Sequence, residues 1–385
     1  MAVTAEQIAE LIRHPPEDEI PRWEDLPADP LKRVLILRKR FPSELVPVVL
    51  ELAELRSRGR SKFLLAERMF FDREGLEQST GETPARWRAR LFAGRGTVAD
   101  LTCAIGGDTI ALAGVSQVLA SDVSPARCEM THANVQVYGV AERVTVRAAP
   151  AEEFPPADAY FLDPSRRASG RRSRHLEDLS PSLKILPELF RVTRDVAVKL
   201  SPATPDAELA SLSCALEFVS EGGVCKEAVA WFGSLAPYNR WASLLPEGNV
   251  LAASPGPAEP AVSNPLEYLL EPDPAIVRAG LIAEVCQVTG AAIMDPRVAY
   301  LTAAHPVTSP FARSYRILAS MPFSEKALRA ELRNLGIGSV EVKKRASAVD
   351  ADRLRPRLES DLAGSGTVIV TRIHNRPWAF ICSRD

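Results

Sequence analysis

The chain has 385 residues, of which 46% are apolar and 25% are charged, so it is long and apolar enough for two or three globular domains. Its 47 Lys and Arg residues are balanced by 49 Asp and Glu residues, and the net charge of −2 excludes a uniformly basic protein that coats nucleic acid. The N-terminus lacks the basic and apolar regions of a secretion signal, and no apolar run approaches the length of a membrane span. We therefore expect a cytoplasmic protein that does not enter a membrane.

The cysteine and histidine spacing bears on metal and redox chemistry. The six cysteines are scattered, form no Cys-x-x-Cys pair and do not cluster with the five histidines. This pattern indicates reduced thiols rather than a disulfide framework, and it predicts that the protein has no metal site.

The first part of the chain, residues 1–94, is predicted to be helical. Apolar residues recur there at the spacing of one helix face, as at Phe41, Leu45, Val48 and Leu52. A Thr-Pro pair further on is typical of a helix start and predicts another helix before the sequence changes character near residue 94.

Short apolar runs, several of them ending in an acid, alternate with helical segments over residues 95–245. This alternation predicts an α/β core with a doubly wound, parallel sheet of the Rossmann type. The predicted strands are 97–101, 118–122, 144–146, 159–163, 196–200, 218–220 and 228–232. The predicted helices are 108–113, 125–138, 183–192 and 208–216.

A Pro-rich stretch at residues 246–263 is predicted to be a linker to a second domain over residues 264–385. The second domain is predicted to be α+β, with its last elements in the order β-α-β-α-β-β. The corresponding segments are 315–320, 324–334, 339–344, 350–362, 367–371 and 378–382.

The turn after the first strand, Asp100-Leu-Thr-Cys-Ala-Ile-Gly-Gly107, is the most informative string in the sequence. Ligands of open α/β sheets bind outside the carboxyl ends of the strands, where this turn lies. It lacks the G-x-G-x-x-G pattern of a pyrophosphate cradle, and an acid at the strand end suits a cationic group better than a phosphate. Asp122 ends the next strand, where its carboxylate can accept hydrogen bonds from two ribose hydroxyls. A nucleoside with a cationic tail, such as S-adenosylmethionine, fits these features.

The same string resembles motif I of the class I S-adenosylmethionine-dependent methyltransferases, in the Asp-x-x-Cys-Gly-x-Gly-Gly form of the RNA cap guanine-N2 methyltransferases. The segment that starts at Asp122 resembles the one that follows motif I in that family. In this chain Ala104 replaces a glycine that is common in the motif. The resemblance implies that the cofactor is held by Asp100, Thr102, Ala104, Gly106, Gly107, Asp122 and, unless a backbone contact serves instead, Glu152.

Asp163-Pro164-Ser165-Arg166 ends the fourth strand and resembles the (Asp/Asn)-Pro-Pro-aromatic motif of enzymes that methylate planar nitrogens. An exocyclic amine conjugated to a ring is a poor nucleophile, and a carboxylate that accepts its hydrogens both orients and activates it. Ser165 replaces the second proline and Arg166 the aromatic residue, and a guanidinium plane can also stack on a base. The resemblance implies that these four residues form the catalytic centre.

Five arginines follow within nine residues, at Arg166, Arg167, Arg171, Arg172 and Arg174. A loop that tracks RNA phosphates and a solvated charge run explain this cluster equally well. Two polar segments also have two interpretations each. Lys199, at the end of the fifth strand, lies either in the cleft or at a capped strand end, and residues 77–80 either close over the cofactor or cap a helix.

The last 75 residues contain 14 basic residues and 8 acidic ones. Their sequence, with Lys343, Lys344 and Arg345 at its centre, resembles the THUMP-like domain that accompanies methyltransferase cores. The resemblance implies that this domain holds structured RNA, while a packing domain with a solvated basic face is the alternative.

Together these patterns predict an S-adenosylmethionine-dependent methyltransferase that acts on a base nitrogen of structured RNA, either tRNA or rRNA, with guanine N2 as the candidate atom. A protein or small-molecule N-methyltransferase is the alternative within the same enzyme class. A non-catalytic RNA-binding protein with a relict cofactor fold is the alternative outside it.

Overall fold

The computed structural model describes residues 3–16, 19–165, 167–168, 171–256 and 259–383. The chain forms two compact units. Unit 1 comprises Met1–Leu216 and Glu227–Pro237, and unit 2 comprises Glu217–Lys226 and Tyr238–Asp385. Unit 1 therefore contains both the predicted helical region and most of the predicted α/β core.

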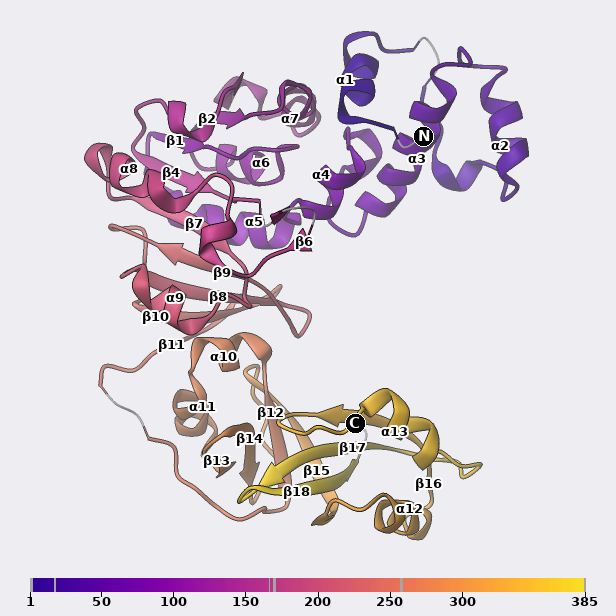
Figure 1. Cartoon of the computed structure of the whole chain (residues 1–385), viewed down its shortest axis with the longest axis vertical. Coiled ribbons are helices and arrows are strands. Elements are labelled where there is room, and N and C mark those ends of the chain that lie inside the picture. Colours follow the sequence, from indigo (N-terminus) through magenta and orange to yellow (C-terminus); the bar gives the residue numbers. More distant parts are fainter. Residues whose placement is uncertain (1–2, 17–18, 166, 169–170, 257–258, 384–385) are drawn as a thin grey trace. The chain divides into compact units, whose positions relative to one another are not determined.

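Among the described residues, the sheet of unit 1 contains parallel strands in the order β3-β2-β1-β4-β7. Figure 1 labels β2, β1, β4 and β7 of this order. Their bounds are β1 Thr97–Asp100, β2 Gln117–Asp122, β3 Val144–Ala148, β4 Ala159–Leu162 and β7 Val196–Leu200. The four residues of β4 are all buried, as expected for a central strand covered on both faces. Strand β9 (Val224–Trp231) pairs antiparallel with β7, so the predicted parallel sheet has an antiparallel extension.

Four helices connect the strands of this sheet, namely α6 (Gly107–Ala113), α7 (Pro125–Val137), α8 (Leu186–Val192) and α9 (Asp206–Ser211). Helix α6 packs on β1 and β2, and α7 packs on β2 and β3. Helix α9 is shorter than predicted, because Leu216 already belongs to the next strand, β8 (Ala215–Glu221).

The N-terminal helices are α1 (Ala5–Arg13), α2 (Pro30–Leu37), α3 (Val46–Gly59), α4 (Arg73–Gln78) and α5 (Glu82–Ala89). They share one hydrophobic core with the helical side of the α/β core, because Leu52 and Phe63 belong to the same buried cluster as Ile105, in the turn after β1, and Met130 of α7. Helix α1 packs on α7, and α5 packs on α6. The helical region is therefore part of unit 1, and its α4–α5 end reaches the edge of the sheet where the strands end.

The segment of unit 2 that starts at Tyr238 contains strands β10 (Arg240–Leu245) and β11 (Asn249–Ala252), which pair antiparallel. Strand β11 lies inside the predicted linker, so the first part of that stretch is folded. The main sheet of unit 2 has the strand order β13-β14-β12-β15-β18-β17-β16. These strands are β12 Tyr268–Pro272, β13 Ala292–Asp295, β14 Val298–Ala303, β15 Ala312–Pro322, β16 Ile337–Lys344, β17 Gly364–Ile373 and β18 Arg376–Ser383.

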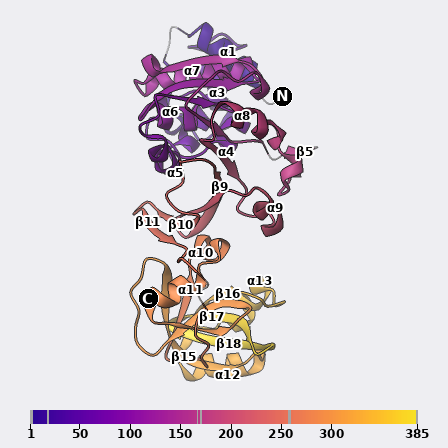
Figure 2. The same cartoon turned by 90° about the vertical axis from the view of Figure 1, so that its left-hand side faces the viewer.

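The helices in the described part of unit 2 are α10 (Pro274–Ala279), α11 (Ile282–Thr289), α12 (Glu325–Asn334) and α13 (Ala351–Leu358). Helices α12 and α13 contact each other and β16. Figure 2 labels these three elements in the orange and yellow part of the chain. The elements from β15 to β18 follow the predicted β-α-β-α-β-β order, and β17 and β18 form the predicted hairpin. Among the described residues, no helix is both long enough and apolar enough to cross a membrane.

Candidate active site

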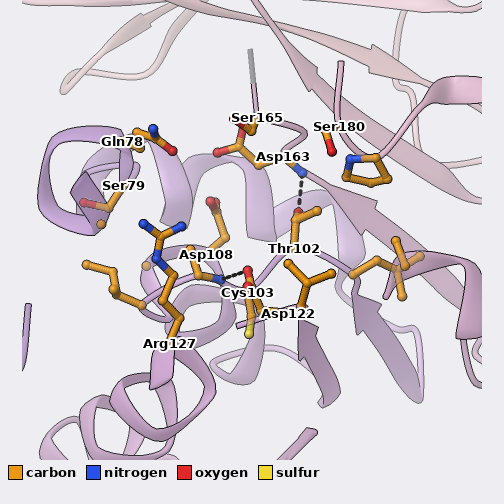
Figure 3. A pocket seen from close by; sticks show the side chains of 18 of the residues that line it. Gln78, Ser79, Thr102, Cys103, Asp108, Asp122, Arg127, Asp163, Ser165 and Ser180 are labelled. Carbon is orange, nitrogen blue, oxygen red and sulfur yellow. Dashed lines mark hydrogen bonds between the residues drawn. The ribbon is translucent and has the colours of Figure 1, made fainter. Parts of the chain in front are cut away.

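A cavity of about 240 Å³ opens at the carboxyl ends of β1, β2 and β4 in unit 1. The side chains of Asp108, Asp122 and Asp163 gather around it (Figure 3). It is lined by Gly75, Gln78, Ser79, Thr80, Leu101, Thr102, Cys103, Ala104, Ile105, Gly107, Asp108, Asp122, Val123, Arg127, Ala151, Glu152, Asp163, Ser165, Ser180 and Pro181. Seven of the predicted site residues therefore meet in one cavity, and the stretch before motif I supplies a further wall.

The turn between β1 and α6 has two residues with left-handed backbone conformations. Gly106 has φ +91°, and a Cβ there would lie 3.2 Å from Cγ2 of Thr131, so a glycine suits both its conformation and its packing. Ala104 has φ +47°, a conformation that glycine adopts at lower cost. The carbonyl of Ala104 accepts a hydrogen bond from Oγ1 of Thr131 at 2.8 Å, which holds the turn against α7.

Asp122 is fixed by two backbone amides at the end of β2. Its Oδ2 accepts from the amide of Ala104 at 3.1 Å, and its Oδ1 accepts from the amide of Ser124 at 2.9 Å. Each carboxylate oxygen has a second lone pair, and the side chain lines the cavity. The carboxylate is therefore a fixed double acceptor at the cavity wall.

Asp100 differs from the prediction, because it is fully buried and does not line the cavity among the described residues. Its Oδ2 accepts from Oγ1 of Thr109 at 2.6 Å, and its Oδ1 accepts from the amide of Thr102 at 3.2 Å. Burial raises the pKa of Asp100 to about 7, although both hydrogen bonds act in the opposite direction. Asp100 supports the turn and α6 from behind the cavity instead of facing a ligand.

Asp163 lies directly after β4 and is held by two neighbours. Its amide donates to Oγ1 of Thr102 at 2.6 Å, so Thr102 fixes the backbone of the catalytic candidate. Its Oδ2 accepts from the ammonium of Lys199 at 2.5 Å. Oδ1 has no hydrogen-bond partner among the described residues, so it remains available to a ligand in the cavity. Lys199, which the sequence left between two interpretations, is therefore an ion-pair partner of Asp163.

A chain of polar contacts extends from this ion pair through unit 1. The ammonium of Lys199 also donates to Oγ1 of Thr80 at 2.9 Å, and this hydroxyl donates to Oδ2 of Asp108 at 3.0 Å. Arg88, only 2% exposed, then bonds both Oδ1 of Asp108 at 2.6 Å and Oε1 of Glu227 at 2.5 Å. Burial of Arg88 opposes its charge, but the two carboxylates raise its pKa.

The segment after Asp163 folds back on itself. Pro164 is buried, and Ser165 and Ser180 exchange backbone hydrogen bonds of 2.7 and 3.0 Å. This pairing brings Ser180 and Pro181 to the cavity wall. Arg166 lies outside the described residues.

The remaining arginines of this segment lie in two short paired strands and just after them. Strands β5 (Arg167–Ala168) and β6 (Arg171–Arg172) pair antiparallel. Arg174 is exposed. The described strands of the arginine-rich segment therefore pair with each other, between residues that line the cavity on either side in sequence, Ser165 and Ser180.

The predicted basic residues of unit 2 have different surroundings. The ammonium of Lys343 donates to Oε2 of Glu271 at 2.6 Å, and Nη1 of Arg345 donates to the carbonyl of Ala299 at 2.5 Å. Lys344, between them, is exposed. Part of the predicted basic patch is thus engaged inside unit 2, with Lys344 directed outward.

Several cavity residues were missed from the sequence: Asp108, Arg127, Ser180 and Pro181. Asp108 follows directly on Gly107, and its position in motif I was a usable signal. Arg127 bridges Asp72 at 3.2 Å and Glu74 at 2.9 Å, contacts that no local pattern indicates.

Comparison with known proteins places this chain in a family. A protein named as an uncharacterized S-adenosylmethionine-dependent methyltransferase in two strains of Mycobacterium tuberculosis is 33% identical over 348 residues, which cover 88% of this chain and 95% of the relative. The chain belongs to the S-adenosylmethionine-dependent methyltransferases. The enzyme class and the cofactor predicted from motif I are therefore confirmed.

Three further matches describe parts of this methyltransferase and its fold. The RNA cap guanine-N2 methyltransferase family model matches residues 95–178, and the THUMP domain-like family model matches residues 312–384. The crystal structure of a protein named as a methyltransferase from Porphyromonas gingivalis W83 is similar with a TM-score of 0.74 and 20% identity, over 99% of both chains. The predicted fold class, with a methyltransferase core and a THUMP-like domain, is confirmed.

The donor and acceptor chemistry of the cavity fits S-adenosylmethionine. The Asp122 carboxylate, fixed by two amides, presents acceptors of the kind that ribose hydroxyls require. The backbone of Ala104 and Gly107 lies at the cavity wall with little side chain to obstruct a ligand. The described lining holds more acids than bases, with Asp108, Asp122, Glu152 and Asp163 against Arg127, and this excess suits a sulfonium cation.

Proposed function

We propose that this methyltransferase modifies a base nitrogen in structured RNA and that guanine N2 is the target atom. The observation that carries the proposal is the position of Asp163, which ends β4 and lines the same cavity as Asp122. A carboxylate at this position can orient an amine beside the methyl donor. The match of the RNA cap guanine-N2 methyltransferase family to residues 95–178, which include both acids, supports the same chemistry.

S-adenosylmethionine supplies an activated methyl group. Asp122 would accept the ribose hydroxyls, while Ala104 and Gly107 would pack against the ligand through their backbones. Glu152 lines the cavity and would face the base of the cofactor. Gly106 and Asp100 would act indirectly, because they shape and support the turn.

Asp163 would bind the target amine through Oδ1, since Oδ2 is occupied by Lys199. The amine nitrogen would then direct its lone pair toward the methyl carbon, and its surplus proton would leave through Oδ1. Thr102 fixes the amide of Asp163, and the ring of Pro164 restricts the backbone that follows. Ser165 would lie beside the substrate at the cavity wall.

RNA would be bound outside this cavity by the basic segments. Exposed Arg174 and the paired strands that contain Arg167, Arg171 and Arg172 would contact phosphates close to Asp163. In unit 2, Lys344 is the exposed member of the predicted patch with Lys343 and Arg345. The THUMP-like match in this unit supports an RNA-holding role.

We propose a matching division of labour along the chain. The helical region 1–94 would complete the cofactor cavity, and the core 95–245 would carry out methyl transfer. Residues 246–263 would connect it to the RNA-holding domain 264–385.

The proposal is tested by identifying the methylated nucleoside. The protein is incubated with labelled S-adenosylmethionine and RNA, and the RNA is digested to nucleosides that are separated by chromatography and mass spectrometry. The expected product is N2-methylguanosine. A label on ribose or on a carbon atom of a base would contradict nitrogen chemistry, and a label in protein or small molecules alone would contradict an RNA substrate.

A further inference from the structure

Lys199 contacts the catalytic candidate without facing the ligand. Its side chain comes from β7, is 13% exposed and is absent from the cavity lining in the described part of the chain. Its ammonium bonds Oδ2 of Asp163 at 2.5 Å and Oγ1 of Thr80 at 2.9 Å. Two of its three donors are thus committed to residues that do line the cavity.

The ammonium of Lys199 compensates negative charge in the cluster around this ion pair. Three described carboxylates surround the ammonium, on Asp108 of α6, Asp163 after β4 and Glu227 of β9. The carboxyl group of Asp100 on β1, whose pKa burial raises to about 7, lies near Asp108 and Asp163. Among the described residues, the cations of the cluster are Lys199 of β7 and Arg88 of α5. Arg88 is committed to Asp108 and Glu227, so Lys199 is the described cation that bonds Asp163.

The contacts also determine the direction in which Asp163 points. A carboxylate with one oxygen held by a fixed ammonium and its amide held by Thr102 has little rotational freedom. Thr80 holds the ammonium in turn, and Asp108 holds Thr80. The acceptor is therefore oriented by a relay of buried and half-buried contacts that starts at Arg88.

We propose that Lys199 is a positioning residue for methyl transfer, an inference that rests on the proposed role of Asp163. Its ammonium places a positive charge against the Asp163 carboxylate and holds Oδ2, so that Oδ1 faces the target amine. Because Lys199 lies behind Asp163, its removal affects the transfer step and not the affinity for the cofactor.

Three substitutions separate charge from hydrogen bonding. Lys199→Met removes both, Lys199→Gln keeps a donor without charge, and Lys199→Arg keeps both. We expect kcat to fall on the order of 10²-fold in Lys199→Met, less in Lys199→Gln and least in Lys199→Arg. The dissociation constant for S-adenosylmethionine should stay within about threefold of the unsubstituted protein in all three. Lys226→Met, at an exposed position of β9, is the control and should leave all values unchanged.

The pH profile gives the readout that a merely structural role would not change. Without the ammonium, a carboxylate among other acids protonates more easily, so the acid limb of kcat should move to higher pH in Lys199→Met and Lys199→Gln but not in Lys199→Arg. Unchanged profiles with a uniform loss of kcat, or a loss of cofactor affinity in step with kcat, would overturn the proposal. If Lys199→Met does not fold, Lys199→Gln gives the same comparison.

A second readout does not depend on catalysis. Carbon-13 NMR of the aspartate carboxyl groups, with Asp163→Asn to assign the signal, follows protonation of Asp163 in the free protein. Protonation should occur at higher pH in Lys199→Gln than in the unsubstituted protein, and identical titrations would overturn the role of Lys199. The proposed RNA substrate is tested separately. If it is wrong, the unsubstituted protein will transfer no methyl group to RNA, although the NMR difference between it and Lys199→Gln is still observed.

Discussion

The ammonium of Lys199 lies 2.5 Å from Oδ2 of Asp163, although 36 residues separate the two in sequence. The contact follows from the sheet, because β4 and β7 are parallel neighbours that pair Leu162 with Val198, one residue before each partner. Parallel strands bring their carboxyl ends to one edge, so a strand-end acid meets a strand-end base. At this edge of the sheet, β4 positions Asp163 and β7 supplies its counter-charge through Lys199.

Asp163→Ala should abolish methyl transfer and leave cofactor binding nearly unchanged. The substitution removes the acceptor for the amine but none of the contacts proposed for the ribose. Calorimetry with S-adenosylmethionine and a transfer assay on the same preparation check the two effects separately. Loss of cofactor binding in Asp163→Ala would show that its role is misassigned.

Asp122→Asn should weaken S-adenosylmethionine binding by about 10- to 100-fold, since charge-assisted hydrogen bonds to buried acceptors contribute about 1.5–3 kcal/mol. Calorimetry measures the dissociation constant, and thermal unfolding checks that the end of β2 stays intact. The matched control is Asp158→Asn. The carboxylate of Asp158 accepts a hydrogen bond from the amide of Thr97 at 2.8 Å, and Asp158 does not line the cavity. Equal effects of the two substitutions would refute the assignment of Asp122.

Ala104→Gly should leave the free energy of unfolding unchanged or raise it by up to about 1 kcal/mol. The left-handed conformation at φ +47° costs alanine more than glycine, which offsets the larger entropy of glycine in the unfolded chain. The control Ala111→Gly in helix α6 should lose about 1 kcal/mol, the usual penalty of glycine in a helix. Urea unfolding measures the free energy of unfolding of both variants. Equal losses of this free energy in Ala104→Gly and Ala111→Gly would contradict a strained backbone at Ala104.

The stability of the protein should fall with rising pH in a way that depends on Asp100. Its pKa is raised from 3.8 to about 7, so the folded state holds a proton that the unfolded state releases. The contribution of Asp100 to the free energy of unfolding is fully present below pH 3.8 and is lost as the pH rises through about 7.

Asp100→Asn cannot ionise, and its amide can still pair with Thr109 and Thr102. The free energy of unfolding of this variant, relative to the unsubstituted protein, should therefore increase from pH 4 to pH 8, by up to about 4 kcal/mol. Urea unfolding at several pH values measures the difference. A difference that does not vary with pH would contradict a neutral buried Asp100.

The strand-end acids could be predicted from sequence because their pattern is local. Asp122 and Asp163 each follow a short apolar run, and parallel strands bring such positions to one edge. Asp100 has the same pattern, yet its carboxylate bonds Thr109 in the core. The direction of a side chain at the last residue of a strand depends on the turn that follows, and Ala104 and Gly106 shape that turn through backbone angles that the sequence does not specify.

Long-range partners could not be predicted, because no local pattern encodes them. Arg88 and Glu227 are 139 residues apart in sequence and meet only after the sheet has formed. Likewise, α4 and the residues after it reach the cavity because the N-terminal helices share a core with the turn after β1 and with α7, as Leu52, Ile105 and Met130 show. Unit boundaries also depend on such packing, which is why β11 lies inside the predicted linker.

The most direct test of an RNA methyltransferase is transfer of labelled methyl groups from S-adenosylmethionine into total RNA from cells that lack this protein. The unsubstituted protein should label this RNA, label RNA from normal cells much less because its sites are already methylated, and lose the activity in Asp163→Ala. Absence of label in RNA from the deficient cells, from protein that binds S-adenosylmethionine in calorimetry, would contradict the account.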